Sequence, residues 1–461
     1  TMTHQRYPST ATTGACTLLD IYAESEGESL SAINNNDNND NNDNNDNIFN
    51  SRIQFNDLKR KISHNMKHNG NNREGPLTHD IYGFNISSQY ISIQDYQSWW
   101  NDYYPYLKRR KRKWIKFLNK CGCFIDDKTH LPNSFPLKFD ELKKFIRKGI
   151  PPEWRGKAWF HFVNGDELMN NNKGVYENLI LKLNQCKYID AIEKDLNRTF
   201  PDNIYFTDSS DSNNDNNSTN PMLDALSRVL KAFSIYNTKI GYCQSLNFIC
   251  GMLLIFMSEE ETFWMLTIIT DKYLPNVHST DLSGLTTYQY SLLKCLHDRL
   301  PDVWKIIMNN NESDNSNIPT LTFCTTNWFM SLFIGVLPIE STLRIWDIIF
   351  YEHPKIILQI SLGIFSMLEP ELKKCKLMTE LFQIIQNTPK RIINVNLFIV
   401  EIFRNLITQN EYNKWFNDNE RLLPELNGIT NWSDDVNIRK LKTAYWNAGL
   451  NRRIKKIYTK K

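Results

Sequence analysis

The strongest constraint on the fold is a helical spacing of apolar residues, which continues through the chain from about residue 136. In one stretch these residues recur at intervals of three and four, at Leu223, Leu226, Leu230 and Phe233. That spacing places them on one face of an α-helix. Asn220 and Pro221 stand directly before the stretch and are typical of an N-cap and a first helical residue. The sequence therefore predicts an amphipathic helix that begins at Pro221.

A second stretch follows Pro338 and has the same spacing, at Ile339, Leu343, Trp346 and Phe350. Within it Glu340 and Arg344 stand four residues apart, so we expect an ion pair on the exposed side of a helix. Further helices are predicted at 175–198, 245–257, 357–369 and 393–408. Alternating apolar runs bounded by tight hairpin turns are nearly absent, which argues against a sheet. The predicted fold class is all-α.

Three tracts are rich in Asn and Asp, at 34–47, 208–220 and 309–317. Such tracts bury too little apolar surface to offset the entropy cost of ordering the chain. We expect residues 1–75 to be disordered, and the two later tracts to be long surface loops because they interrupt patterned sequence. The predicted organisation is a disordered region (1–75), an aromatic and basic segment (76–135), the main helical domain (136–430), and a C-terminal helix with a basic tail (431–461).

Composition argues against several classes of protein. The formal net charge is only +3, so no global field marks a nucleic-acid binder. The nine cysteines do not suggest a disulfide framework in a chain of this size, and Cys121 and Cys123 lack a second pair at zinc-ligand spacing, so we expect no metal site. The longest strongly apolar run, 248–257, is about half the length of a membrane span. With no signal-like run at its start, the chain is expected to be cytoplasmic.

Residues 90–120 combine aromatic side chains with a basic run, which consists of Lys108, Arg109, Arg110, Lys111, Arg112 and Lys113. One interpretation is a solvated helix face whose aromatics pack on the domain that follows. Another is contact with an anionic membrane or an acidic partner such as a polarity complex, since each basic residue near an anionic membrane contributes about 1 kcal/mol. A third is nuclear import or nucleic-acid contact, although no nucleic-acid fold signature accompanies the run and we expect no nucleic-acid partner.

Motifs for common chemistry are absent from the sequence. It contains neither of the Gly-rich phosphate loops, which argues against a nucleotide site of its own. It also lacks the nucleophile elbow of hydrolases and the paired histidines of zinc proteases. Two polar elements remain within apolar helical sequence and are candidates for function.

Asp195 and Arg198 lie three residues apart on one helical face, and Pro201 ends the helix shortly afterwards. Arg198 therefore lies where a long cationic side chain can project outward, although a helix-terminal role paired with Asp195 explains it equally simply. The second element is Gly241-Tyr242-Cys243-Gln244, directly before the apolar helix predicted at 245–257. Gln244 there can cap the helix, bridge two segments or orient a water molecule.

Together these segments resemble the TBC family of Rab GTPase-activating proteins, in the family's order, over about residues 142–425. Residues 145–159 (FIRKGIPPEWRGKAW) resemble the opening motif; Ile192, Asp195 and Arg198 follow as I-x-x-D-x-x-R, and Tyr242 and Gln244 as Y-x-Q. A later structural block is similar at Trp328, Phe329, Phe333, Pro338 and 343–347 (LRIWD). The chain departs from the family at Ser245-Leu246, where many members carry Gly-Met.

The resemblance implies a TBC-type multi-helix domain of two helical halves. It also implies a GTPase activator that supplies an arginine finger, Arg198, and a glutamine finger, Gln244, to a Rab. GTP and magnesium would belong to the Rab, so no cofactor of its own is expected. Asp195 would orient Arg198 with Arg155 as a second partner, Tyr242 would support the Gln244 loop, and Arg344 and Asp347 would be scaffold.

The Asn-rich inserts and the segment Asp80–Phe84 (DIYGF) look similar to fungal members linked to secretory-vesicle Rabs, exocytosis and polarised growth. That similarity implies a peripheral location at membrane sites of vesicle traffic. The insert after Pro201 lies beside the Arg198 helix, where it would shape which Rab fits. The competing interpretation is a catalytically silent TBC scaffold that binds a GTPase or a polarity complex.

Overall fold

The computed structural model describes residue 48 and residues 50–58, 78–127, 131–207, 220–308 and 318–426. Over these ranges regular structure is helical, with only isolated β-bridges besides, so the all-α prediction is confirmed. Residues 50–58 are helical although they fall within the stretch expected to be disordered. The described residues leave out most of that stretch and the two later Asn-rich tracts apart from Asn220. They also leave out the predicted C-terminal helix at 431–461.

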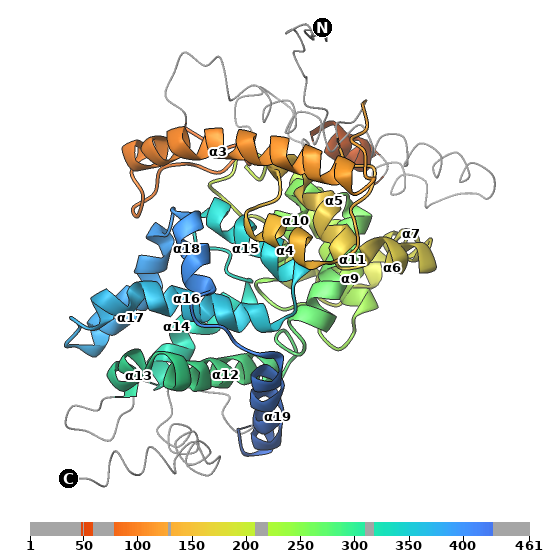
Figure 1. The fold of residues 1–461 in the computed structure, drawn as a ribbon. Coiled ribbons are helices and arrows are strands. Elements are labelled where there is room, and N and C mark those ends of the chain that lie inside the picture. The colour runs from red at the N-terminus through yellow and green to blue at the C-terminus, as the bar shows by residue number, and fades with distance from the viewer. Residues whose placement is uncertain are drawn as a thin grey trace, which may run out of the picture.

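The helical domain has two halves (Figure 1). The first contains α4 (Asp140–Arg147), α5 (Arg155–Phe162), α6 (Gly165–Asn171), α7 (Val175–Ile180), α8 (Ile189–Leu196), α9 (Pro221–Tyr236), α10 (Leu246–Phe256) and α11 (Glu259–Ile268). The second contains α12 (Ser283–Arg299), α13 (Pro301–Met308), α14 (Ile318–Met330), α15 (Ile339–Tyr351), α16 (Lys355–Leu372), α17 (Met378–Asn387), α18 (Val395–Ile402) and α19 (Gln409–Leu426). Helix α15 joins the halves, because it packs on α4 and α5 as well as on α16 and α18.

The start of α9 follows the prediction in detail. The Asn220 side chain accepts hydrogen bonds from the backbone N–H groups of Met222 (2.9 Å) and Leu223 (3.3 Å), and Pro221 occupies the first turn. The predicted helices at 245–257 and 357–369 correspond to α10 and α16. Helix α18 (Val395–Ile402) is shorter than the predicted range 393–408. The Asn394 side chain caps its start.

The helix predicted at 175–198 is wrong as a single element. It is divided into α7, the 3₁₀ turn η3 (Leu183–Gln185) and α8. The chain turns at Cys186, which has extended backbone angles and whose buried sulfur lies 3.0 Å from the Ser234 hydroxyl on α9. Packing against α9 therefore outweighs the local helical preference at this point.

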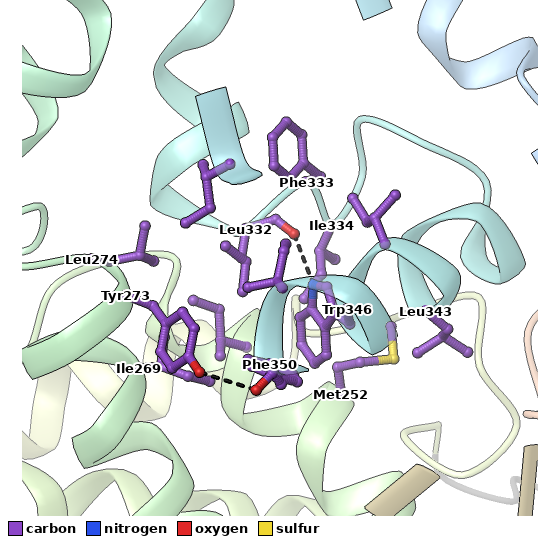
Figure 2. Packing of buried hydrophobic residues seen from close by; sticks show 14 of the residues in the cluster. Met252, Ile269, Tyr273, Leu274, Leu332, Phe333, Ile334, Leu343, Trp346 and Phe350 are labelled. Carbon is purple, nitrogen blue, oxygen red and sulfur yellow. Dashed lines mark hydrogen bonds between the residues drawn. The ribbon is translucent and has the colours of Figure 1, made fainter. Parts of the chain in front are cut away.

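The centre of the core is α15, in which every residue from Glu340 to Tyr351 is buried. Figure 2 shows Trp346 donating its indole N–H to the backbone oxygen of Leu332 (3.0 Å), which ties α15 to the loop after α14. Beside it, the Tyr273 hydroxyl donates to the Phe350 backbone oxygen (3.1 Å). These two buried donors thus each have a backbone acceptor, as burial away from water requires.

Complete burial of α15 corrects the predicted surface ion pair. Glu340 and Arg344 are both buried, and both contact the Tyr103 hydroxyl, which donates to Glu340 (2.7 Å). Glu340 pairs with Arg155 (2.8 Å), while the Arg344 guanidinium donates to the Tyr103 hydroxyl (3.0 Å). The four-residue spacing was read correctly as helical, but it carries no information on which face of the helix meets solvent.

Helix α3 (Ile93–Lys120) lies across one side of the helical domain (Figure 1). The Trp114 indole N–H donates to the Gly149 backbone oxygen (2.8 Å), and the Tyr106 hydroxyl donates to the Lys148 backbone oxygen (2.7 Å). Tyr103 and Trp114 are buried. The aromatic side chains of this segment therefore pack on the domain, as one of the three interpretations expects.

Candidate functional site

Arg198 follows the end of α8, where the chain leaves the helix. Its side chain is 54% exposed and forms an ion pair with Asp195, whose own side chain is only 3% exposed. A buried carboxylate thus holds the base of an arginine side chain that otherwise reaches solvent. The buried residue Ile192, one turn earlier, fixes this face of α8 against the core. The predicted pairing of Asp195 with Arg198 is present in the structure.

The second oxygen of Asp195 binds the other candidate element. The Tyr242 hydroxyl donates to Asp195 Oδ2 at 2.5 Å, while Oδ1 faces Arg198. Burial, together with this hydrogen bond, raises the pKa of Tyr242 well above its ordinary value, so the hydroxyl remains a donor at neutral pH. One carboxylate therefore connects the arginine and glutamine segments, which are 47 residues apart in sequence.

Gln244 is exposed and stands just before α10, as predicted. Its neighbour Cys243 is half-buried, and burial raises the pKa of the Cys243 thiol to about 11. The sulfur is therefore protonated at neutral pH, which argues against a nucleophilic role. Gln244 therefore presents a neutral amide, and the neighbouring thiol is neutral as well.

A second set of hydrogen bonds joins the arginine and glutamine segments, and it was not predicted. The Thr199 hydroxyl donates to the Asp195 backbone oxygen (2.6 Å) and accepts from the Asn247 side-chain amide (2.7 Å). Asn247 Oδ1 in turn accepts the backbone N–H of Ser245 (3.1 Å). The residues that follow the arginine and the glutamine are thereby joined through buried groups, Asn247 being completely buried.

The turn that presents Gln244 requires unusual backbone angles. Ser245 has φ +97°, a conformation that favours glycine, and its hydroxyl donates to the Met330 backbone oxygen (2.9 Å). Gly241 has φ +62°, and an added Cβ would lie 2.4 Å from the Tyr188 ring. The departure from Gly at position 245 thus falls on a strained residue, whose hydroxyl gains a hydrogen bond in return.

Arg155 lies in a different place from the one predicted, and this is a correction. It is fully buried, and its guanidinium contacts Glu340 (2.8 Å), Asp347 (3.3 Å) and the Tyr82 hydroxyl (2.6 Å) rather than Asp195 or Arg198. Because burying an unpaired cation costs a great deal of free energy, an arginine enclosed in this way needs such partners. Arg155 is therefore part of the scaffold.

Asp347 has the scaffold role expected of it. Its carboxylate accepts hydrogen bonds from the Trp159 indole N–H (2.9 Å) and from the Ile150 backbone N–H (3.1 Å), besides the contact with Arg155. Burial raises the pKa of Asp347 despite the neighbouring Arg155. The opening motif and the later structural block thus meet inside the protein, away from the exposed groups of Arg198 and Gln244.

Among the residues that the structure describes, no cluster of three or more His, Cys, Asp or Glu side chains has the geometry to hold a metal ion. No helix in those same ranges is both long enough and apolar enough to cross a bilayer.

Residues 152–373 match the model of the Rab-GTPase-TBC domain. A curated relative, GTPase-activating protein MSB4 of Saccharomyces cerevisiae, is 41% identical over 378 residues, which covers 70% of this chain and 75% of the relative. The chain belongs to the Rab-GTPase-TBC domain family. The resemblance stated from the motifs is thereby confirmed.

Other members show how far the likeness extends. GTPase-activating protein GYP3 of Saccharomyces cerevisiae is also 41% identical, over 72% of this chain but only 60% of the relative's length. Human growth hormone-regulated TBC protein 1 is 34% identical over 62% of this chain and 77% of the relative. The crystal structure of the Chlamydomonas flagellar RabGAP TBC domain superposes with a TM-score of 0.56 at 23% identity, covering 70% of this chain and 99% of that domain, which supports the TBC fold.

Proposed function

We propose that this TBC protein accelerates GTP hydrolysis on a Rab-family GTPase by inserting Arg198 and Gln244 into the Rab's nucleotide site. The observation that carries the proposal is the shared carboxylate: Asp195 binds Arg198 with one oxygen and Tyr242 with the other. Both candidate side chains are exposed, and both stand on buried supports. That is the arrangement of a preorganised site that acts on a partner.

The proposed roles follow from phosphoryl-transfer chemistry. Catalysis of GTP hydrolysis consists of neutralising charge at the phosphates and placing a water molecule in line. The Arg198 guanidinium would neutralise charge, and the Gln244 amide would orient the water. GTP and Mg²⁺ would be carried by the Rab, so we expect this chain to bind no nucleotide alone. An arginine supplied in trans contributes about 10³- to 10⁵-fold in rate.

The test is single-turnover GTP hydrolysis by a panel of purified Rabs, beginning with secretory-vesicle Rabs because of the resemblance to fungal members in exocytosis and polarised growth. Wild type is compared with Arg198→Ala, Arg198→Lys and Gln244→Ala. All three variants should lose stimulation, Lys included, because an ammonium lacks the planar fork of a guanidinium. Each variant is first checked for folding by circular dichroism and thermal unfolding.

The chain offers a matched control for the arginine. Arg404 is 64% exposed and pairs with Glu401 three residues earlier, as Arg198 pairs with Asp195. Arg404→Ala should therefore keep wild-type activity. Full activity of Arg198→Ala would refute the mechanism. Absence of stimulation on every Rab, with binding to a GTP-loaded Rab retained, would instead favour the silent scaffold.

We also propose that the exposed cations of α3 hold the protein peripherally at an anionic membrane. The basic run divides in the structure: Arg110 is buried against Phe145, and Lys111 pairs with Glu153 (2.5 Å). The remaining four, Lys108, Arg109, Arg112 and Lys113, are exposed. Cosedimentation with phosphatidylserine vesicles should fall when these four become Gln, whereas the exposed pair Lys182→Gln and Lys187→Gln should leave it unchanged. Equal cosedimentation of both variants would refute the proposal.

A further inference from the structure

The segment Asp80–Asn85 forms a tight turn that precedes the region matched by the family model. The Asp80 carboxylate accepts the backbone N–H groups of Tyr82 (2.8 Å) and Phe84 (2.9 Å), and the Asp80 N–H donates to the Phe84 backbone oxygen (2.7 Å). Gly83 has φ +88°, which a residue with a side chain adopts only at a cost. The turn therefore has one defined shape, set by its own residues.

One side of this turn binds the chain that directly follows Arg198. The Ile204 N–H donates to the Gly83 backbone oxygen (3.0 Å), and the Asn85 N–H donates to the Asp202 backbone oxygen (3.1 Å). The Asn203 side-chain amide donates to the Tyr82 backbone oxygen (3.0 Å). These three hydrogen bonds lie within four to six residues of Arg198, so the turn fixes the segment through which the arginine leaves α8.

Aromatic packing joins the same parts. The Phe84 ring meets the Phe200 ring edge to face, with centroids 5.1 Å apart, and Phe200 is buried at φ +52°. Phe200 also contacts Phe248 on α10, with centroids 5.6 Å apart. A non-glycine residue at positive φ persists only where its surroundings hold it. Phe84 is one of the groups that hold Phe200, two residues after Arg198.

The other side of the turn is anchored in the core. The Tyr82 hydroxyl donates to Glu340 Oε2 (2.7 Å) and accepts from the Arg155 guanidinium (2.6 Å). All three side chains are buried. The turn thus connects the buried ion pair of α5 and α15 with the segment that follows Arg198.

We propose that Asp80–Asn85 is a positioning element for Arg198, and that it transmits the rigidity of the buried ion pair to the arginine loop. This inference rests on the proposed function, because it assigns the turn a part in placing the arginine. It makes a segment outside the matched region of the family necessary for full activity. None of its residues would touch the nucleotide; each would act through the orientation of Arg198.

The decisive variant is Gly83→Ala, because an added Cβ would lie 2.4 Å from the Tyr205 ring and the backbone at φ +88° would be strained. The matched control is Gly122→Ala, at φ +76°, where an added Cβ would meet nothing within 4 Å. Both replace a glycine at positive φ, but only the first disturbs the arginine loop. Phe84→Leu keeps an apolar side chain and removes the edge-to-face contact, and it takes the place of Gly83→Ala if that variant does not fold.

The first measurement is single-turnover hydrolysis by the responsive Rab at saturating full-length protein. Gly83→Ala should lower the maximal rate about ten-fold while the half-saturating concentration changes less than two-fold, and Gly122→Ala should match wild type. In the Arg198→Ala background, Gly83→Ala should cost nothing further, since the turn acts through the arginine. A loss of equal size with and without Arg198, or an unchanged rate, would overturn the proposal.

The second measurement does not depend on any Rab. Hydrogen exchange of backbone amides in residues 198–206 should quicken in Gly83→Ala by ten-fold or more and remain as in wild type in Gly122→Ala. Unchanged exchange would overturn the positioning role. If wild type stimulates no Rab while exchange responds as expected, the proposed GTPase activation fails but the mechanical link stands, so the two failures are distinguishable.

Discussion

At the scale of single residues, Asp195 is the group on which both candidate side chains depend. Its replacement by Asn keeps the size of the side chain but removes the negative charge that faces Arg198. We expect Asp195→Asn to lower the maximal rate of Rab GTP hydrolysis about ten-fold, because a misplaced guanidinium loses much of its effect on the transition state. Single-turnover hydrolysis at saturating protein measures this.

The control for Asp195→Asn is Asp190→Asn, on the same helix at an exposed position. It removes the same charge from α8 without touching the site, and it should retain the wild-type rate. Wild-type hydrolysis by Asp195→Asn would show that the carboxylate does not orient Arg198.

Ser245 permits a prediction about strain. Ser245 has φ +97°, and a non-glycine residue with a positive φ costs about 1–3 kcal/mol. The hydrogen bond from the Ser245 hydroxyl to the Met330 carbonyl returns about 1 kcal/mol. Ser245→Gly should therefore leave the free energy of unfolding equal to or above that of wild type. Ser245→Ala keeps the strain and loses the bond, so it should lie below both, by about 1 kcal/mol relative to wild type. Urea denaturation ranks the three, and a variant order with Ala above Gly would contradict the strain argument.

At the scale of helices, α9 is held at its start by one side chain. Asn220→Ala should lower the free energy of unfolding by about 1 kcal/mol, since two N–H groups of the first turn lose their acceptor. Asn178→Ala, at an exposed position inside α7, should change stability by less than about 0.5 kcal/mol. Equal effects of the two changes, measured by urea denaturation, would show that the cap contributes nothing.

Helix existence was predictable where a cap and a strong period coincide, as at Asn220 and Pro221. Breaks within helices were less predictable, because the division of 175–198 depends on the contact of Cys186 with Ser234 on another helix. The site was partly readable: Arg198, Asp195, Tyr242 and Gln244 came from motifs. The bridging Asn247 and the partners of Arg155 did not, since hydrogen bonds between distant residues leave no local pattern. The segment Asp80–Phe84 resembles fungal members in sequence, but its contacts with Phe200 and Asn203 depend on the fold.

At the scale of the whole molecule, one carboxylate joins three separate parts of the chain. Glu340 on α15 accepts from Tyr82 in the turn, Tyr103 on α3 and Arg155 on α5. Burial alone would raise the pKa of Glu340, but Arg155 and the two hydroxyl groups bring it below its ordinary value. Glu340 is therefore ionised at neutral pH, and the segment 78–120 is bound to the same buried charge as the helical domain.

A contact between His278, which lies in the segment before α12, and Met330 on α14 predicts how stability depends on pH. His278 is buried and donates from Nε2 to the Met330 backbone oxygen (2.8 Å), the same oxygen that accepts from Ser245. Burial lowers the pKa of His278 to about 4, against an ordinary value of 6.5. Between these two values the unfolded chain binds a proton that the native protein does not bind, so stability falls as the pH falls.

The variant His278→Gln keeps an amide donor for the Met330 oxygen but cannot titrate. From pH 7 to pH 5, wild type should lose about 2 kcal/mol more of its free energy of unfolding than the variant, at 1.36 kcal/mol per pH unit below 6.5. Burial raises the pKa of Asp80 to about 7, which gives the opposite dependence, but both proteins retain Asp80 and the effect cancels in their difference. Urea denaturation at the two pH values measures that difference. Equal losses of unfolding free energy in wild type and His278→Gln would mean that His278 is protonated in the native protein and that its surroundings accommodate the buried charge.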